Sequence, residues 1–413
     1  MRLWLSDAII VMACVVGACE APTPARVRVV DLDADGEHHL TDVRLETDPD
    51  LSSLASGALR LRGGGRVVID GLRFQRAEAE GLDADAARHL ALEHPGRPVE
   101  FRYLVEGDVA IPDDHESLLM ASAYHGLERA RAFFWRHDVS LATRSTLEVC
   151  FGCGLFVDLG VPLPYIVNDN AAYVAFADTF VLFPELLLGE VPIAADAAIL
   201  SHELSHRVFR YAVYSGAAYA RLLDAFSHQA ALSPEEWRTL NLLKALDEGS
   251  ADFFAAAFAG NPRFATASLG ALGEGAARDL EGARARGERY DQVFEQAAAQ
   301  NQEVVTDAAG GHAIGSGDWD PYHLGTLWAG ALWRLGADED GARDLEQLRE
   351  QVVPMLLRAL RTVGAGLEQR FVFDFELAVR ALVEESAPEQ RARVCALLAD
   401  TFPGQIARVD ACS

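Results

Sequence analysis

Two histidines and a glutamate within five residues give this chain its clearest chemical signal. Residues 201–206 read Ser-His-Glu-Leu-Ser-His and contain the pattern H-E-x-x-H. In an α-helix, positions i and i+4 share one face, so the imidazoles of His202 and His206 would lie side by side and could bind one metal ion. Glu203 would lie about 100° further round, close enough to take a proton from a water at that metal. Neutral imidazole nitrogens suit zinc, so the segment predicts one catalytic zinc with Glu203 as its base.

The residues around this pattern follow the period of a buried helix. Ile199, Phe209 and Val213 share the face of the two histidines at spacings of three and four. This stripe places the pattern on a helix. The simpler alternative is a pair of core histidines on an apolar stripe, with no metal.

A second acidic segment could complete the site. Residues 245–254 read Ala-Leu-Asp-Glu-Gly-Ser-Ala-Asp-Phe-Phe, with Glu248 and Asp252 again at i and i+4. A catalytic zinc takes three protein ligands, and carboxylates among apolar residues need a partner. We therefore predict Glu248 as the third ligand and Asp252 as the carboxylate that holds one zinc histidine in the right tautomer. An exposed acidic patch is the alternative.

Together, H-E-L-S-H and D-E-G-S-A-D resemble the glutamate zincins, the thermolysin-like and fungalysin-like zinc metallopeptidases. The resemblance is specific over about ten residues and diffuse over residues 115–385. It implies zinc on His202, His206 and Glu248, with Glu203 as general base. The gap between His206 and Glu248 is longer than we expect in thermolysin-like enzymes, so we predict an inserted helix near residues 215–235.

The same resemblance implies further site residues. Members of the family supply a His or Tyr, after the third ligand, to stabilise the oxyanion, and Tyr322 and His323 are adjacent donors in that region. Their surroundings do not match the thermolysin segment closely, so an ordinary Tyr at a helix start beside a surface His is the alternative. Asn170 and Ala171 match the Asn-Ala strand that binds substrate backbone at the cleft edge. An ordinary sheet edge would explain them equally well.

Composition limits the possible partners. The chain has 413 residues, half of them hydrophobic, and a net charge of −26. This length allows two domains and a large core. The acidic balance disfavours nucleic acid and adsorption to anionic lipid, because no basic stripe is present to meet phosphates.

The amino terminus and the cysteines indicate export. Ala8–Ala18 is an apolar run too short to cross a bilayer, and it ends Val-Gly-Ala before Cys19. This resembles a bacterial lipobox and implies cleavage after residue 18 with lipidation of Cys19, which would anchor the protein to a membrane of the cell envelope. Plain secretion is the alternative. Four further cysteines predict two disulfides, for which three connectivities are possible. Of these we expect local pairing, Cys150–Cys153 and Cys395–Cys412.

These features must be positioned by an α+β fold. We predict a signal peptide over residues 1–18, a tether and β-rich amino-terminal domain over 19–112, and a zincin-type domain over 113–413. Within the last, residues 113–215 would hold a mixed sheet and the zinc helix, and 216–413 a mostly helical lobe. The glycines at residues 63–65 predict a hairpin between flanking strands. Between Asp31 and Asp42, oxygen-bearing residues have nearly the spacing of a Ca²⁺ loop, but an acidic turn between strands is favoured.

The sequence thus predicts a zinc-dependent endopeptidase that hydrolyses peptide bonds. Two alternatives remain open: a catalytically inactive envelope lipoprotein with a binding or structural role, and a zinc hydrolase that acts on another amide.

Overall fold

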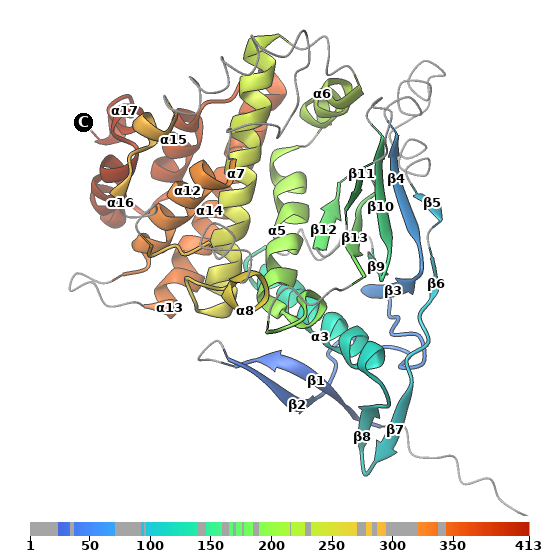
Figure 1. The fold of residues 1–413 in the computed structure, drawn as a ribbon. Coiled ribbons are helices and arrows are strands. Elements are labelled where there is room, and N and C mark those ends of the chain that lie inside the picture. The colour runs from blue at the N-terminus through green and yellow to red at the C-terminus, as the bar shows by residue number, and fades with distance from the viewer. Residues whose placement is uncertain are drawn as a thin grey trace, which may run out of the picture.

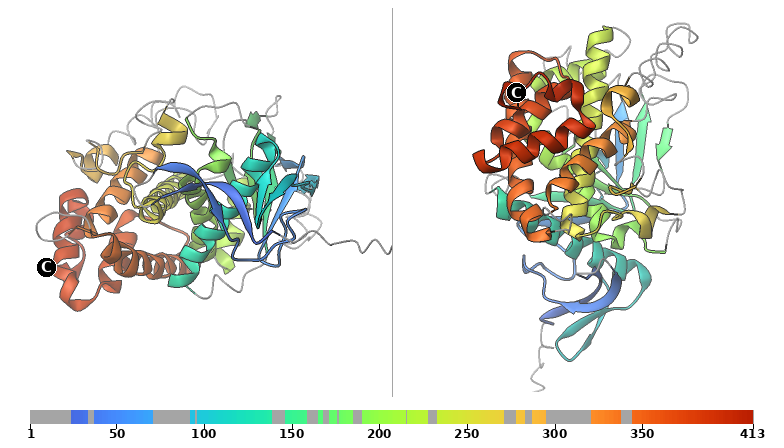
Figure 2. Two further views of the ribbon diagram at one scale, coloured as in Figure 1. Left: turned by 90° about the horizontal axis from the view of Figure 1, so that it is seen from below. Right: turned by 90° about the vertical axis from the view of Figure 1, so that its left-hand side faces the viewer.

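In the part of the chain that the structure describes, three mixed β-sheets lie on one side and a group of helices on the other (Figures 1 and 2). The computed structural model describes residues 24–33, 37–70, 92–94, 96–138, 146–158, 165–167, 171–175, 177–184, 190–214, 216–227, 233–270, 278–282, 287–294, 321–337 and 344–412. The predicted signal peptide, Cys19 and Asn170 lie outside these residues. The mixed α/β character agrees with the expected fold class.

The amino-terminal sheet has the strand order β2-β1-β8-β7. It contains β1 (Arg26–Leu32), β2 (His38–Val43), β7 (Tyr103–Glu106) and β8 (Val109–Pro112). β1 and β2 pair antiparallel, as the acidic-turn interpretation expects. Asp42 accepts a bond from Arg28 at 2.8 Å, and Asp31 pairs with Arg129. Each of the two carboxylates is therefore bonded to its own guanidinium group. The described residues therefore give no support to a calcium loop.

A five-stranded sheet, with order β12-β13-β9-β3-β6, lies beside the predicted metal helix. Its strands are β3 (Leu59–Gly63), β6 (Arg97–Pro98), β9 (Leu147–Phe151), β12 (Ala171–Val174) and β13 (Thr179–Leu182). β9 pairs parallel with both β3 and β13, whereas β12 pairs antiparallel with β13 only. β12 is therefore an edge strand of this sheet.

The predicted hairpin at residues 63–65 is wrong, because its two strands belong to different sheets. β4 (Arg66–Asp70) lies in a third sheet, order β11-β10-β4-β5, with β5 (Leu92–His94), β10 (Gly154–Asp158) and β11 (Tyr165–Val167). Gly64 has φ +64°, a left-handed conformation that lets the chain turn between the sheets. The predicted disulfide Cys150–Cys153 is confirmed and joins β9 to the start of β10.

Two of the helices that follow, α3 and α7, begin at local capping signals. α3 (His115–His137) follows Asp114, whose side chain accepts the Ser117 N–H. α5 (Ala197–Val213) carries the H-E-x-x-H pattern, and α6 (Gly216–Ser227) lies where an additional helix is expected. α7 (Pro234–Ala259) opens with a capping box formed by Ser233 and Glu236 and ends at Gly260, which has φ +72°.

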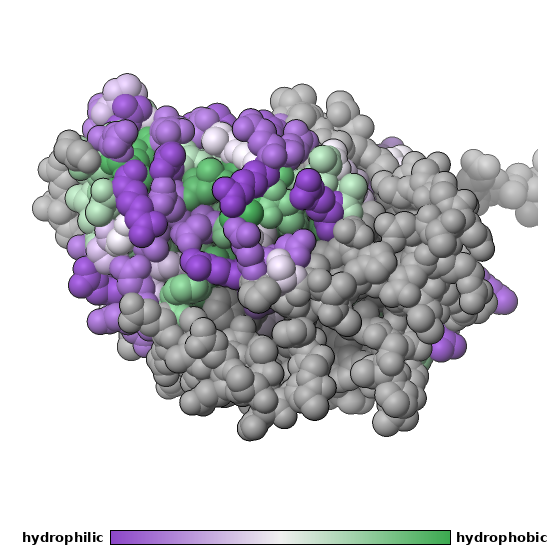
Figure 3. All heavy atoms as spheres, turned by 90° about the horizontal axis from the view of Figure 1, so that it is seen from above, coloured by the Kyte–Doolittle hydropathy of each residue, from purple (hydrophilic) through white to green (hydrophobic). Residues whose placement is uncertain are grey.

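A carboxy-terminal group of helices covers α7 on the side away from the sheets (Figure 1). It contains α12 (Pro321–Leu335), α13 (Leu345–Gln347), α14 (Val353–Gln369), α15 (Phe375–Glu385), α16 (Pro388–Thr401) and α17 (Pro403–Ile406). A π-helical segment at Leu348–Val352 separates α13 from α14, and Pro354 lies in the first turn of α14, where its missing N–H is tolerated. The second predicted disulfide, Cys395–Cys412, is also confirmed. Seen from above, the described surface here mixes hydrophilic and hydrophobic residues (Figure 3).

The contact between α7 and α12 depends on glycine. A Cβ atom added to Gly249 would meet the Gly325 backbone oxygen at 2.3 Å, so only glycine permits this approach. The two glycines therefore allow close packing of these helices. The contact sets the distance from α12 to the segment that contains Glu248.

The predicted domain boundary after residue 112 does not separate independent sheets. β3 and β4, which precede it, pair with β9 and β10, which follow it. One cluster of buried apolar residues extends from Val27 in β1 to Val409 near the carboxy terminus. Strand pairing between distant segments, which sequence patterns do not encode, is the physical reason for this difference.

Candidate metal centre

The candidate site begins with the fixed start of α5. Asp196 is fully buried and caps the helix by accepting the backbone N–H groups of Ala198 and Ile199. Its second oxygen accepts the Ser268 hydroxyl at 2.6 Å. Because the cap holds the first turn in place, the orientation of the next turns, which carry the histidines, is also set.

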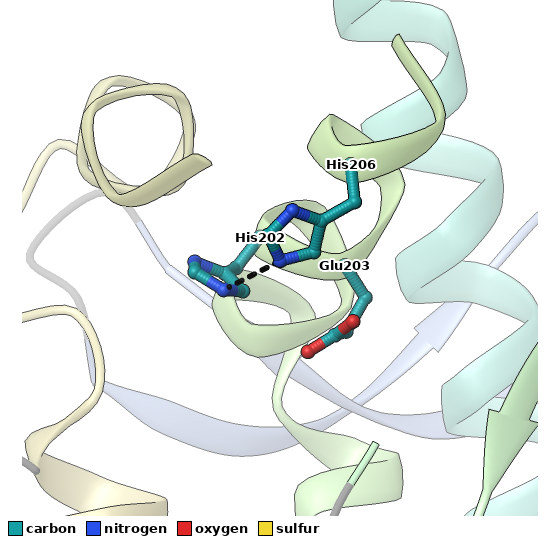
Figure 4. A group of neighbouring side chains, drawn as sticks. All are labelled: His202, Glu203 and His206. Atoms are coloured by element: carbon teal, nitrogen blue, oxygen red, sulfur yellow. Dashed lines mark hydrogen bonds between the residues drawn. The ribbon is translucent and has the colours of Figure 1, made fainter. Parts of the chain in front are cut away.

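His202 and His206 face each other on successive turns of α5 (Figure 4). Their Nε2 atoms are 3.1 Å apart, and the ring planes are nearly perpendicular. Ligand atoms of His202, His206 and Glu203 all lie within 4.8 Å of one another. This group has the donor types and the proximity needed to hold a metal ion.

Helix α7 brings Glu248 to the same point. Its Oε2 lies 3.5 Å from His202 Nε2 and 3.9 Å from His206 Nε2, so the three atoms form a compact triangle. Ligand atoms of a tetrahedral zinc stand roughly 3.3 Å apart at ordinary bond lengths. The other oxygen, Oε1, accepts a bond from Lys244 at 2.5 Å. Burial raises the pKa of the Glu248 carboxyl, but Lys244 and His206 outweigh burial and hold it well below its usual value.

Each histidine has its own carboxylate on the Nδ1 side. Asp252 Oδ1 lies 3.0 Å from His202 Nδ1, and Asp247 Oδ1 lies 2.8 Å from His206 Nδ1. A carboxylate accepts but does not donate, so each Nδ1 carries the proton in these bonds. In a neutral ring each Nε2 is then an acceptor, and His202 Nε2 also lies 3.0 Å from Arg278 Nη1.

Two lone pairs 3.1 Å apart repel unless a cation lies between them. A proton can serve in the metal-free protein. Burial lowers the pKa of His206, but Asp247 and Glu248 outweigh burial and raise it to about 9. The surroundings of the two Nε2 atoms therefore favour positive charge between them, either a proton or a metal ion.

Glu203 faces the edge strand β12. Its Oε2 accepts the backbone N–H of Tyr173 at 2.9 Å, which leaves Oε1 for another partner. Ala171 is the first residue of the same strand and is buried. The structure thus brings Ala171 near the metal helix, while Asn170 lies outside the described residues.

Tyr322 and His323 differ in their surroundings. Tyr322, at the start of α12, is 38% exposed and its ring lies 4.6 Å from the Arg278 guanidinium. The negative charge of Glu248 raises the pKa of Tyr322, followed by the effect of burial, which places this phenol near the candidate ligands. His323 instead bonds to Glu288 through Nε2.

Sequence reasoning missed three site residues. Arg278 Nη1 lies 3.0 Å from His202 Nε2, 2.7 Å from Asp252 Oδ1 and 3.5 Å from Glu248 Oε2. No spacing relates Arg278 to either motif, so nothing in the sequence could have identified it. Asp247 and Lys244 flank Glu248, and their positions one residue and one helical turn away were a usable signal.

An α/β protein with a His-Glu-His group on a buried helix is the class that these observations define. No protein-family model matches the chain, and no curated protein matches it. Among the described residues, no helix is long and apolar enough to cross a membrane. The two disulfides are typical of proteins from oxidising compartments.

Proposed function

We propose that this protein is a zinc-dependent peptidase whose ligands are His202, His206 and Glu248. The observation that carries the proposal is the convergence of two Nε2 atoms and one carboxylate oxygen, with separations of 3.1, 3.5 and 3.9 Å, beside the Glu203 carboxylate. Three protein ligands of the types His, His and Glu are the donor set of a catalytic zinc that retains an open position.

The charges around the triangle also fit a divalent cation. Four carboxylates, those of Glu203, Asp247, Glu248 and Asp252, face two cationic side chains, Lys244 and Arg278. With neutral imidazoles this leaves a net charge of about −2, which one Zn²⁺ would neutralise in a mostly buried site.

Glu203 is the residue placed to move protons. Zinc, when bound, would polarise the scissile carbonyl and lower the pKa of water. The Tyr173 N–H fixes one Glu203 oxygen, so the other can accept a proton from the attacking water. Glu203 then passes this proton to the leaving amine. The edge strand β12 would orient the substrate by backbone pairing near Ala171 and Asn170.

Tyr322 is the better of the two proposed oxyanion donors. It lies within the field of Glu248 and Glu203, whereas His323 is bonded to Glu288. A phenol that remains protonated can donate to a developing oxyanion, which is worth about 3–4 kcal/mol. Asp247 and Asp252 act through the histidines by holding each ring with Nε2 free.

Export and anchoring complete the proposal. We propose that the protein acts in the cell envelope, held by lipid on Cys19, with peptides or proteins as substrates and no nucleic acid partner. The net charge of −26 and the two disulfides support this placement.

Elemental analysis of zinc in residues 20–413 is the first test. The native chain should bind one zinc, and Glu248→Ala should bind it at least tenfold more weakly, since one of three ligands is removed. Glu235→Ala, at the exposed start of α7, is the matched control and should retain zinc. A native protein that binds no zinc after incubation with the metal would overturn the metal site.

Peptide-library cleavage then separates catalysis from binding. Glu203→Gln should keep the zinc but lower the cleavage rate by at least a hundredfold, because the proton acceptor is lost. A zinc-loaded native protein that cleaves no peptide would favour a binding role or another amide substrate instead.

A further inference from the structure

A second cavity lies on the face of α5 opposite the metal ligands. Residues of α3 and α5 line about 320 Å³ of empty space, including its open mouth. The α5 residues that line it include Leu204, Arg207 and Tyr211, at spacings of three and four. His202 and His206 lie on the other side of the helical wheel, so this cavity is separate from the candidate metal centre.

Two arginines point into this cavity from different helices. Arg131 of α3 stacks its guanidinium 3.5 Å from the centre of the Trp135 ring, which fixes the plane of the charged group. Arg207 of α5 is buried and binds Asp178 through two bonds of 2.8 and 3.0 Å. In the part of the chain that the structure describes, no carboxylate lies within ion-pair distance of Arg131.

The described residues that line the cavity include two guanidinium groups and no carboxylate. Burial, followed by the charge of Arg207, lowers the pKa of Arg131 to about 10. Asp178 pairs with Arg207, and the charge of Glu128 partly opposes the lowering of the Arg131 pKa. The remaining lining residues are apolar or aromatic. Apolar walls focus such a field, and paired guanidinium groups match the geometry of an oxyanion.

We propose that this cavity binds a small oxyanion, phosphate or carboxylate, between Arg131 and Arg207. The enclosed part of this cavity is small and most of its space belongs to the open mouth, so the ligand is limited to a small group that remains partly in contact with solvent. Arg131 would contribute the available charge, and Trp135 and Tyr211 would flank the bound group.

The site is connected to the metal helix by a chain of contacts. Arg207 binds Asp178, Asp178 accepts the Tyr173 hydroxyl at 2.7 Å, and the Tyr173 N–H binds Glu203. An anion that shares Arg207 with Asp178 would weaken the first of these contacts. The bound anion would thereby change the contacts of Glu203, the proposed general base, without binding at the metal centre.

The proposal is tested by titrating residues 20–413 with sodium phosphate and, separately, with sodium acetate. Calorimetry and tryptophan fluorescence measure the binding. At least one anion should bind with one-to-one stoichiometry, and more weakly as NaCl is added. Arg131→Leu should weaken binding at least tenfold, and the matched Arg136→Leu, on an exposed position of the same helix, should leave it unchanged.

The fluorescence change should disappear in Trp135→Phe, which places the bound anion beside that ring. Binding of phosphate alone would identify a phosphate site, and binding of acetate a carboxylate site. The proposal would be overturned if neither anion bound saturably up to ~20 mM. It would also be overturned if Arg131→Leu bound the anion as tightly as the native protein.

Discussion

At the scale of single residues, the candidate metal centre is a place where a proton and a metal compete. The Nε2 atoms of His202 and His206 face each other at 3.1 Å, and their Nδ1 atoms face carboxylates. The metal-free site satisfies this geometry by protonation of His206, whose pKa is raised to about 9. Metal binding must then displace that proton.

We expect zinc binding at pH 7.5 to release about one proton, because His206 is protonated below pH 9 in the metal-free form. Calorimetry in two buffers of different ionisation enthalpy measures the number released. Because the pKa of His206 is raised, its protonation stabilises the folded metal-free protein. The contribution of His206 to the stability of the metal-free protein is present below about pH 6.5 and is lost as the pH rises through 9. Zinc binding without proton release at pH 7.5 would contradict this account.

Arg278 places a permanent charge beside a ligand atom, 3.0 Å from His202 Nε2. A guanidinium there repels a divalent cation, and at an effective dielectric constant of about 20 the repulsion is several kcal/mol. Arg278→Gln should therefore tighten zinc binding by tenfold or more in competition with a chelator. Arg263→Gln, on a nearby exposed residue, is the control. Weaker zinc binding in Arg278→Gln would show instead that the arginine organises the ligands.

Asp178 is the residue on which the turn between β12 and β13 depends. It accepts two bonds from Arg207 and one each from the hydroxyls of Tyr173 and Tyr211. Burial raises its pKa, but these donors, Arg207 first, lower it to about 2. Its charge therefore stabilises the folded state above about pH 3.8, and this contribution is lost as the pH falls through 2.

Asp178→Asn should lower the free energy of unfolding by about 2–4 kcal/mol at pH 7, because a buried guanidinium loses its counter-ion. Asparagine tolerates the positive φ of +46° at this position, so backbone strain is not the cause. Asp108→Asn, which breaks the exposed pair with Arg26, should change the free energy by less than about 1 kcal/mol. Denaturant unfolding at pH 7 and pH 3 measures both, and an equal loss at the two pH values would exclude the charge as the cause.

At the scale of elements, the approach of α12 to α7 positions Glu248. Gly249 follows the proposed ligand directly, and any Cβ on it would overlap the Gly325 backbone. Gly249→Ala should lower the free energy of unfolding by about 1–3 kcal/mol and weaken zinc binding, since the helices must separate. Gly57→Ala, where an added Cβ meets nothing within 4 Å, is the control. Unchanged zinc affinity in Gly249→Ala would mean that α12 does not set the position of Glu248.

Elements that depend on local signals were predictable, and those that depend on distant pairing were not. The capping box at Ser233, the Asp114 cap and the i, i+4 histidines are all encoded within one helical turn. The strands on either side of Gly64 were also identified, but their partners were not, because β9 and β10 lie more than eighty residues further along the chain. Arg278 could not be predicted as a site residue for the same reason, because only the tertiary fold brings it to His202.

At the scale of the whole molecule, the same pairing makes β3 and β4 part of one folded unit with β9 and β10. Leu59 and Leu61 of β3 are fully buried, and β3 lies between β9 and β6. The Ser122 hydroxyl of α3 accepts the Val30 N–H of β1 and donates to the Leu118 carbonyl of its own helix. It thereby links α3 to β1. Removal of residues 24–112 would expose a long edge of β9 and the apolar face of α3.

We therefore expect residues 113–413 alone to lack a cooperative thermal transition, whereas residues 24–413 should unfold in a single step. Circular dichroism during heating, at the same zinc concentration for both chains, measures the difference. The sheet that carries β12 would be incomplete in the shorter chain, so the contact between Tyr173 and Glu203 would have no fixed support. Cooperative unfolding of residues 113–413 with one bound zinc would instead show that the amino-terminal strands are an addition to an independent metal-binding domain.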